Sequence, residues 1–108
     1  MSDHELLEMA AKACGYWDKQ YQVPDKLPVP DWNPLKDDAQ AFWLAVKLKI
    51  DIVPVDPDGF SHAYTTNTSE CPAFRASERR SSMHFASELA ATRRAIVRAA
   101  AAIGEQMP

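Results

Sequence analysis

The 108-residue chain has few of the residues on which catalytic and nucleotide-binding motifs depend. Its three glycines are isolated, which excludes a glycine-rich phosphate-binding loop, and each stands where a helix end or a turn is expected. No apolar run approaches the roughly 18 residues that a membrane span requires. The N-terminus is acidic and lacks the basic segment and apolar core of a secretory signal. We therefore expect a cytoplasmic protein that does not contact a membrane.

Histidine and cysteine are too few and too scattered to indicate a metal site or an activated nucleophile. His62, Cys71 and His84 could hold zinc only with a further acidic ligand, and no two of them stand at ligand spacing. Asp37 and Asp38 are neighbours, so at a helix start they point about 100° apart and do not form a catalytic pair. The sequence therefore predicts no catalytic residues, no metal site, no cofactor and no enzymatic activity.

What is present is the composition of one globular domain over residues 1–108, with 46% hydrophobic and 25% charged residues. A chain of this length buries about two thirds of its unfolded surface without metals or crosslinks. Cys14 and Cys71 are accordingly expected to be free thiols in a reducing compartment. They could pair only if the fold brings them together.

The two signs of charge are unevenly distributed along the chain. Residues 1–60 hold all six lysines and eleven acidic residues, a net charge of −5. Residues 61–108 hold all six arginines and four acidic residues, a net charge of +2. Both compositional drift and a basic C-terminal surface that meets an anionic partner would explain this split. The sequence pI near 5.5 argues against general nucleic-acid binding.

Amphipathic helices are predicted at both ends of the chain. Residues 3–14 form the first helix, which stops at Gly15. Residues 85–103 form the last helix, with Ser87 as its cap and Gly104 as its stop. The expected core face of the last helix consists of Leu89, Thr92, Ile96, Val97, Ala99, Ala100 and Ile103.

A third helix is predicted in the middle of the chain, within residues 32–50. Counted at about 100° per residue from Asp38, apolar side chains cover most of its circumference. Asp37 or Asp38 can accept bonds from the first-turn amides. The apolar positions are Ala39, Ala41, Phe42, Trp43, Ala45, Val46 and Leu48. We therefore expect this helix to be covered on more than one side, between the last helix and a sheet, with no room for a reactive pocket.

Two stretches are predicted to be extended. Residues 16–34 contain four of the eight prolines, which cannot donate to a strand ladder, so this stretch holds two short strands at most, near 16–23 and 27–32. A hairpin is predicted after the central helix, where β-branched residues at 50–55 and a returning strand at 60–66 flank a Pro-Asp-Gly turn.

Alternate residues of the returning strand are expected to point to opposite faces of the sheet. Phe60, His62 and Tyr64 are expected on one face, opposite Ser61, Ala63 and Thr65. The polar residues 67–82 that follow indicate a long loop with a short strand near Phe74 at most. Together these elements predict an α+β domain in which a small antiparallel sheet of three or four strands packs with three helices, in the order α-β-(β)-α-β-β-α.

Three blocks of the sequence resemble a known family. They are Glu5–Gly15, the run Trp32–Asp38 that continues into Leu44–Leu48, and Ala90–Gly104. The blocks resemble a family of small proteins that tailed phages and prophages encode, related to the phage ABA sandwich domain. The resemblance implies a phage origin and an α+β fold with helices packed on a small antiparallel sheet, and it implies no established activity. The chain departs from the family in its prolines before Trp32 and in its longer, arginine-bearing segment 67–85.

Arg93 is the one charged residue of the last helix that points toward its core face, between Ile96 and Val97. A guanidinium in this position needs a partner, either a carboxylate of Asp37 or Asp38 or an external ligand. We expect the internal ion pair.

A partner-binding surface is expected where the chain departs from the family, because aromatic residues and arginine are enriched at interfaces. The candidate residues are Trp17, Tyr21, Trp32, Phe74, Arg75, Arg79 and Arg80. Nucleic-acid binding would instead use the arginines Arg75, Arg79, Arg80, Arg94 and Arg98, with Tyr64 or Phe74 stacking on bases.

The sequence thus predicts a phage-encoded accessory protein that binds a host or phage protein, as a monomer or a homodimer. An inhibitor of a host or anti-phage defence factor, such as an anti-CRISPR protein, fits this description. The alternatives are a nucleic-acid-binding phage protein and a minor structural or assembly protein of the virion.

Overall fold

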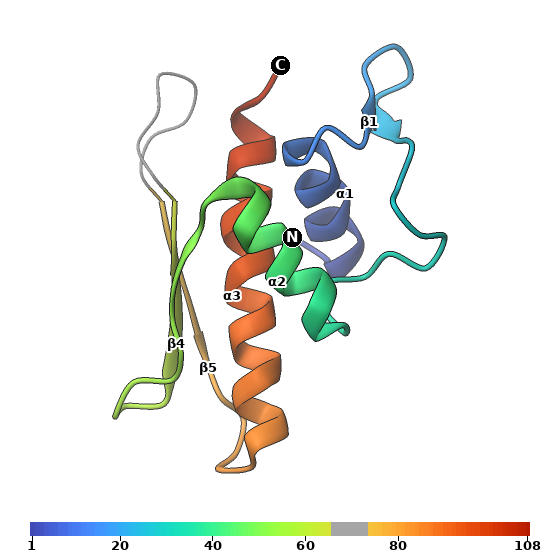
Figure 1. The fold of residues 1–108 in the computed structure, drawn as a ribbon. Helices are drawn as coiled ribbons and strands as arrows, with labels where there is room; N and C mark the ends of the chain where they lie inside the picture. Colours follow the sequence, from blue (N-terminus) through green and yellow to red (C-terminus); the bar gives the residue numbers. More distant parts are fainter. Residues whose placement is uncertain (66–73) are drawn as a thin grey trace.

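The computed structural model describes residues 1–65 and 74–108. Within them the chain forms three helices and two small antiparallel sheets, which confirms the predicted α+β class (Figure 1). Along the chain the elements are α1 (Asp3–Ala13), β1 (Trp17–Asp18), β2 (Val23–Pro24), α2 (Asp38–Leu48), β3 (Asp51–Val53), β4 (Phe60–Tyr64), β5 (Arg75–Arg79) and α3 (Phe85–Gln106). None of the helices in this described part combines the length and apolarity needed to cross a membrane.

The long C-terminal helix α3 is the centre of the molecule. It lies between the sheet β3–β4–β5 on one side and helices α1 and α2 on the other (Figure 1). Its alanines allow this close packing, and Val97, Ala99 and Ala100 have no exposed surface.

The prediction that α2 is the covered central element is wrong. Helix α2 packs on α3 with only Ala41, Leu44 and Ala45 buried. Phe42, Trp43 and Val46, which were expected in the core, are 62%, 64% and 60% exposed. A helical wheel shows how many sides of a helix are apolar, but it does not show how many sides find a neighbour.

Both helix starts in the first half of the chain follow from their capping residues. The Ser2 hydroxyl accepts the Glu5 amide at the start of α1, and the Asp37 carboxylate accepts the Gln40 amide at the start of α2. The predicted stop after α1 is confirmed at Gly15, which has a positive φ of 85°.

The ends of α3 differ from the prediction. His84 occupies the N-cap position without a side-chain bond, and Ser87 lies inside the first turn, bonded to Ser82. Gly104 is not a stop, because the helix continues to Gln106. Gly104 instead faces the backbone of Met9, so closely that a Cβ there would overlap the Met9 carbonyl. This glycine therefore lets α1 and α3 approach each other.

The three-stranded sheet contains the predicted hairpin and one further strand. The amide of Gly59 donates to the Asp56 carbonyl at 2.9 Å, which closes the turn between β3 and β4. Strand β5 then pairs with β4, with His62 opposite Ser77. We expected residues 67–82 to form a loop with at most one short strand near Phe74, whereas strand β5 spans Arg75–Arg79. Residues 66–73 lie outside the described residues.

The extended segment before α2 contains less strand than the prediction allowed. Strands β1 and β2 form a ladder of two residue pairs. Residues 27–32 form no strand, which fits the two prolines within this stretch.

Candidate functional site

The outer face of the sheet is the surface on which functional side chains gather. The helices lie on the other side, against Ser61, Ala63 and Ala76, which are fully buried (Figure 1). The outer face, defined by the strand register, carries Asp51 and Val53 from β3, Phe60, His62 and Tyr64 from β4, and Arg75, Ser77 and Arg79 from β5. The face thus has an acidic residue at one edge, aromatic rings in its centre and two arginines at the other edge.

The two arginines lie against the aromatic rings. The Arg75 guanidinium carbon is 5.9 Å from the centre of the Tyr64 ring, and that of Arg79 is 5.9 Å from the centre of the Phe60 ring. Between these rings His62 stacks on Phe60 at 6.3 Å. Contacts of this kind hold a guanidinium over a ring by its charge and leave it at the surface. Both arginines are indeed exposed.

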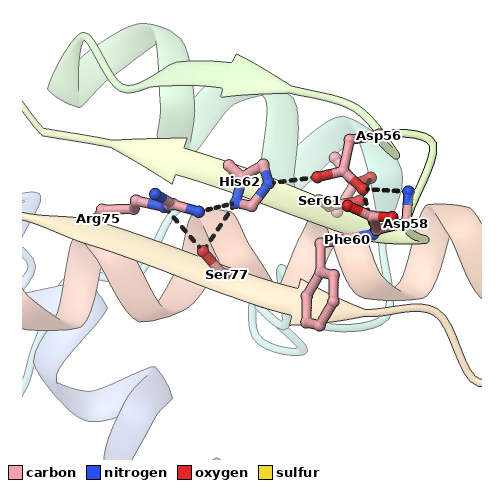
Figure 2. A network of polar contacts seen from close by, with 8 residues as sticks. Asp56, Asp58, Phe60, Ser61, His62, Arg75 and Ser77 are labelled. Atoms are coloured by element: carbon pink, nitrogen blue, oxygen red, sulfur yellow. Dashed lines mark hydrogen bonds and ion pairs between the residues drawn. The ribbon is translucent and has the colours of Figure 1, made fainter.

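A chain of polar contacts fixes Arg75 and runs across the face (Figure 2). His62 Nε2 is 2.8 Å from the Asp56 carboxylate, and His62 Nδ1 is 2.7 Å from the Ser77 hydroxyl. Arg75 donates through Nε to the Ser77 oxygen at 3.0 Å, and its Nη2 is 3.2 Å from His62 Nδ1. Because a guanidinium only donates, Nδ1 is the acceptor and Nε2 carries the proton that Asp56 accepts. The donations therefore run from Arg75 to Ser77 to His62 to Asp56.

Asp56 anchors this chain to the turn. Its carboxylate also accepts the amides of Asp58 and Phe60, each at 2.9 Å. The bond from the Phe60 amide, followed by that from His62, holds the pKa of Asp56 below its ordinary value of 3.8. The charge of Asp56 thus holds the ring of His62 in one orientation.

The order Asp, His and Ser is that of a hydrolase relay, but the contacts favour a different role. In a relay the hydroxyl is free to attack a substrate. Here the Ser77 oxygen already accepts from Arg75, and the His62 ring is buried within the sheet face. In this arrangement the Ser77 oxygen and the His62 ring hold Arg75 in place.

The predicted partner-binding residues do not form one surface. Arg75 and Arg79 lie on the outer face, and Phe74 immediately precedes β5. Arg80 turns toward α3 instead, where it pairs with Glu88 at 2.9 Å.

The remaining candidates lie at the other side of the molecule, around the β1–β2 hairpin (Figure 1). Tyr21 is exposed at its tip, whereas Trp17 is half-buried beneath the ammonium of Lys12. Trp32 packs edge-to-face on Tyr16 at the margin of the core. These three residues therefore lie apart from the arginines of β5.

The other arginines form ion pairs within the fold. Arg93 contacts the Asp38 carboxylate at 2.6 Å and the Leu35 carbonyl at 2.8 Å, whereas Asp37 caps α2. Arg94 and Arg98 both contact Glu78. Among the arginines that could bind nucleic acid, Arg75 and Arg79 are thus the two that are exposed and that lie over aromatic rings.

Neither cysteine contributes to the outer face. Cys14 is buried, and burial raises the pKa of its thiol from 9.0 to about 11. Cys71 lies outside the described residues, and so does any pairing between the two. In residues 1–65 and 74–108, no three His, Cys, Asp or Glu side chains are arranged to hold a metal ion.

Sequence reasoning missed the contact of Asp56, His62 and Ser77, because it depends on the pairing of β4 with β5. Ala76 is the one apolar residue of 75–79, so this segment lacks the apolar–polar alternation that indicates a strand. Comparisons of the chain with family models, with curated proteins and with solved structures gave no match.

Proposed function

We propose that the chain is a phage-encoded accessory protein that acts in the cytoplasm of the host cell by binding another protein. The observation that supports this proposal best is the outer face of the sheet, which none of the helices in the described residues covers, with Arg75 and Arg79 held over Tyr64 and Phe60. The phage origin rests on the family resemblance of the sequence.

The side chains on this face are of the kinds that dominate binding energy at protein interfaces. Tyrosine and arginine are enriched among residues whose truncation costs more than about 2 kcal/mol of binding. The polar chain from Arg75 to Asp56 fixes one such arginine before a partner arrives, so less side-chain entropy is lost on binding.

The partner is expected to present acidic groups opposite β5. Arg75 and Arg79 are both on this edge, and each can donate two bonds to one carboxylate. A domain of this size that covers such a surface on a host or anti-phage defence factor would inhibit it by occupying its binding site.

A pull-down from nuclease-treated host lysate tests this proposal. We expect wild-type protein to retain one protein partner in stoichiometric amount and the Arg75→Ala/Arg79→Ala variant to lose it. Lys19→Ala/Lys36→Ala removes the same charge from exposed residues away from the sheet, and this control should still bind. Equal retention by all three proteins, or no protein partner at all, would contradict the proposal.

Nucleic-acid binding is the second candidate for the same face, because arginines stacked on aromatic rings also receive unpaired bases. The net charge of −3 and the acidic Asp51 on the same face weigh against it. If single-stranded nucleic acid binds with strong salt dependence, and Arg75→Ala/Arg79→Ala removes that binding, this candidate replaces the first.

A further inference from the structure

Helix α2 carries an exposed apolar stripe that the outer sheet face does not involve. Phe42, Trp43 and Val46 are each about 60% or more exposed, and Ala39 completes the stripe at helical spacing. A crevice of about 40 Å³ beside Trp43 is lined in part by Tyr16, Pro28, Trp32 and Lys47. Apolar side chains grouped in this way mark an interaction surface, which makes the stripe a candidate docking site.

The charges at the two ends of α2 identify the occupant of this site. Asp37 and Asp38 stand at the N-terminal end, and Lys47 and Lys49 stand at the C-terminal end. The stripe runs from Ala39 to Val46, so Asp38 directly precedes it and Lys47 and Lys49 follow it. The stripe with its two charged ends is therefore complementary to the same stripe of a second copy in the antiparallel orientation.

We infer that the stripe on α2 is the interface of a homodimer in which the two α2 helices pack antiparallel about a two-fold axis near Trp43. In this arrangement the acidic N-terminal end of each α2, where Asp38 also pairs with Arg93 of its own chain, meets the basic C-terminal end with Lys49 of the other copy, and the two helix dipoles oppose each other favourably. A parallel pair would bring carboxylates against carboxylates and ammonium groups against ammonium groups, so the charges select the antiparallel arrangement.

The size of the stripe fits the core of a small interface. The exposed parts of Phe42, Trp43 and Val46 amount to roughly 350 Å² per copy, given the areas that such side chains bury. Two copies contribute about 700 Å², which is the apolar half of an interface near the lower end of the stable range of about 1,200–2,000 Å². The rim is then polar, and the charged helix ends supply it. The outer sheet faces remain free for a partner in each copy.

Sedimentation equilibrium of the full chain tests the inference. We expect the mass of a dimer, which dissociates on dilution. Phe42→Glu should raise the dimer dissociation constant at least about 100-fold, because each dimer loses two aromatic anchors. Val46→Glu is a second variant at the same stripe and should act in the same direction. Phe85→Glu is the matched control, because Phe85 is 71% exposed at the start of α3 and away from the stripe.

Lys49→Glu tests the direction of packing. It should weaken the dimer more than Lys49→Gln does, and the difference between the two should shrink at high salt. Circular dichroism confirms that each variant is folded. A monomer at every concentration, or a dimer that both stripe variants leave intact, would overturn the inference. A dimer that is lost in Phe42→Glu but is equally stable in Lys49→Glu and Lys49→Gln would overturn the antiparallel arrangement.

Discussion

Because α1 and α3 approach each other closely at Gly104, we expect alanine at this helical position to destabilise the protein, which is the reverse of its usual effect. Alanine normally stabilises a helix by about 1 kcal/mol relative to glycine. At position 104, however, an ideal Cβ lies 2.8 Å from the carbonyl carbon of Met9, where ordinary contact begins at 3.4 Å. The Met9 carbon must therefore retreat by about 0.6 Å, and its oxygen by more. Because the obstacle is backbone, it cannot rotate away, and α1 must shift as a whole.

Overpacking of this kind costs about 1–3 kcal/mol and sometimes more. We expect the cost to exceed the gain in helix propensity, so that Gly104→Ala lowers the free energy of unfolding by about 2 kcal/mol. A loss of this size lowers Tm by roughly 10 °C in a chain of this length. Urea and thermal unfolding, followed by circular dichroism at 222 nm, measure both quantities.

The matched control is Ala90→Gly, at an exposed position of the same helix. It should cost about 1 kcal/mol through propensity alone. If Gly104→Ala instead stabilised the protein by about the same amount, α1 and α3 would not approach each other as the structure describes.

Three further predictions concern Arg93, Asp56 and Cys14. Arg93→Ala should lower the free energy of unfolding by about 1 kcal/mol. The loss should be larger than that in Asp38→Asn, because the Asp38 side chain is 60% exposed whereas Arg93 is largely buried. Urea unfolding of the two variants measures the difference. The pKa of Asp56 is lower in the folded chain than in the unfolded chain. The stabilisation that its charge supplies is therefore complete above the unfolded value of 3.8 and is lost as the pH falls through the folded value. This loss should be absent in Asp56→Asn when unfolding is followed between pH 6 and pH 2. In a Cys71→Ser background, Cys14 should resist alkylation by iodoacetamide at pH 8 until the chain is unfolded. The reason is that the thiol is buried and its pKa is raised to about 11. Rapid labelling of the native protein would contradict this prediction.

Most of the local structure could be predicted because its signals are local. Asp37 caps α2, Gly15 ends α1 and Gly59 closes the hairpin, each within a few residues of its partner. The need of Arg93 for a carboxylate also followed from its position on the wheel. Two candidates, Asp37 and Asp38, followed from the sequence, and the packing of α2 on α3 selects Asp38, which lies 55 positions away.

The arrangement of the helices could not be predicted, because the helical period shows which side of each helix is apolar but not which of these sides is buried most deeply. The alanines of α3 look weakly apolar in sequence, yet their small size places α3 between the sheet and two helices. The larger side chains of α2 looked like core residues and are at the surface. The outer sheet face was hidden for a related reason, since Ser77 meets His62 only through the register of β5.

The proposal that this protein binds another protein on its outer sheet face is tested most directly by isothermal titration of the captured partner. We expect Arg75→Ala/Arg79→Ala to raise Kd at least about tenfold, as one good charge-assisted contact is worth about 1.5–3 kcal/mol. Lys19→Ala/Lys36→Ala should leave Kd within about twofold of the wild-type value. Equal Kd values for wild type and the double arginine variant would contradict the account.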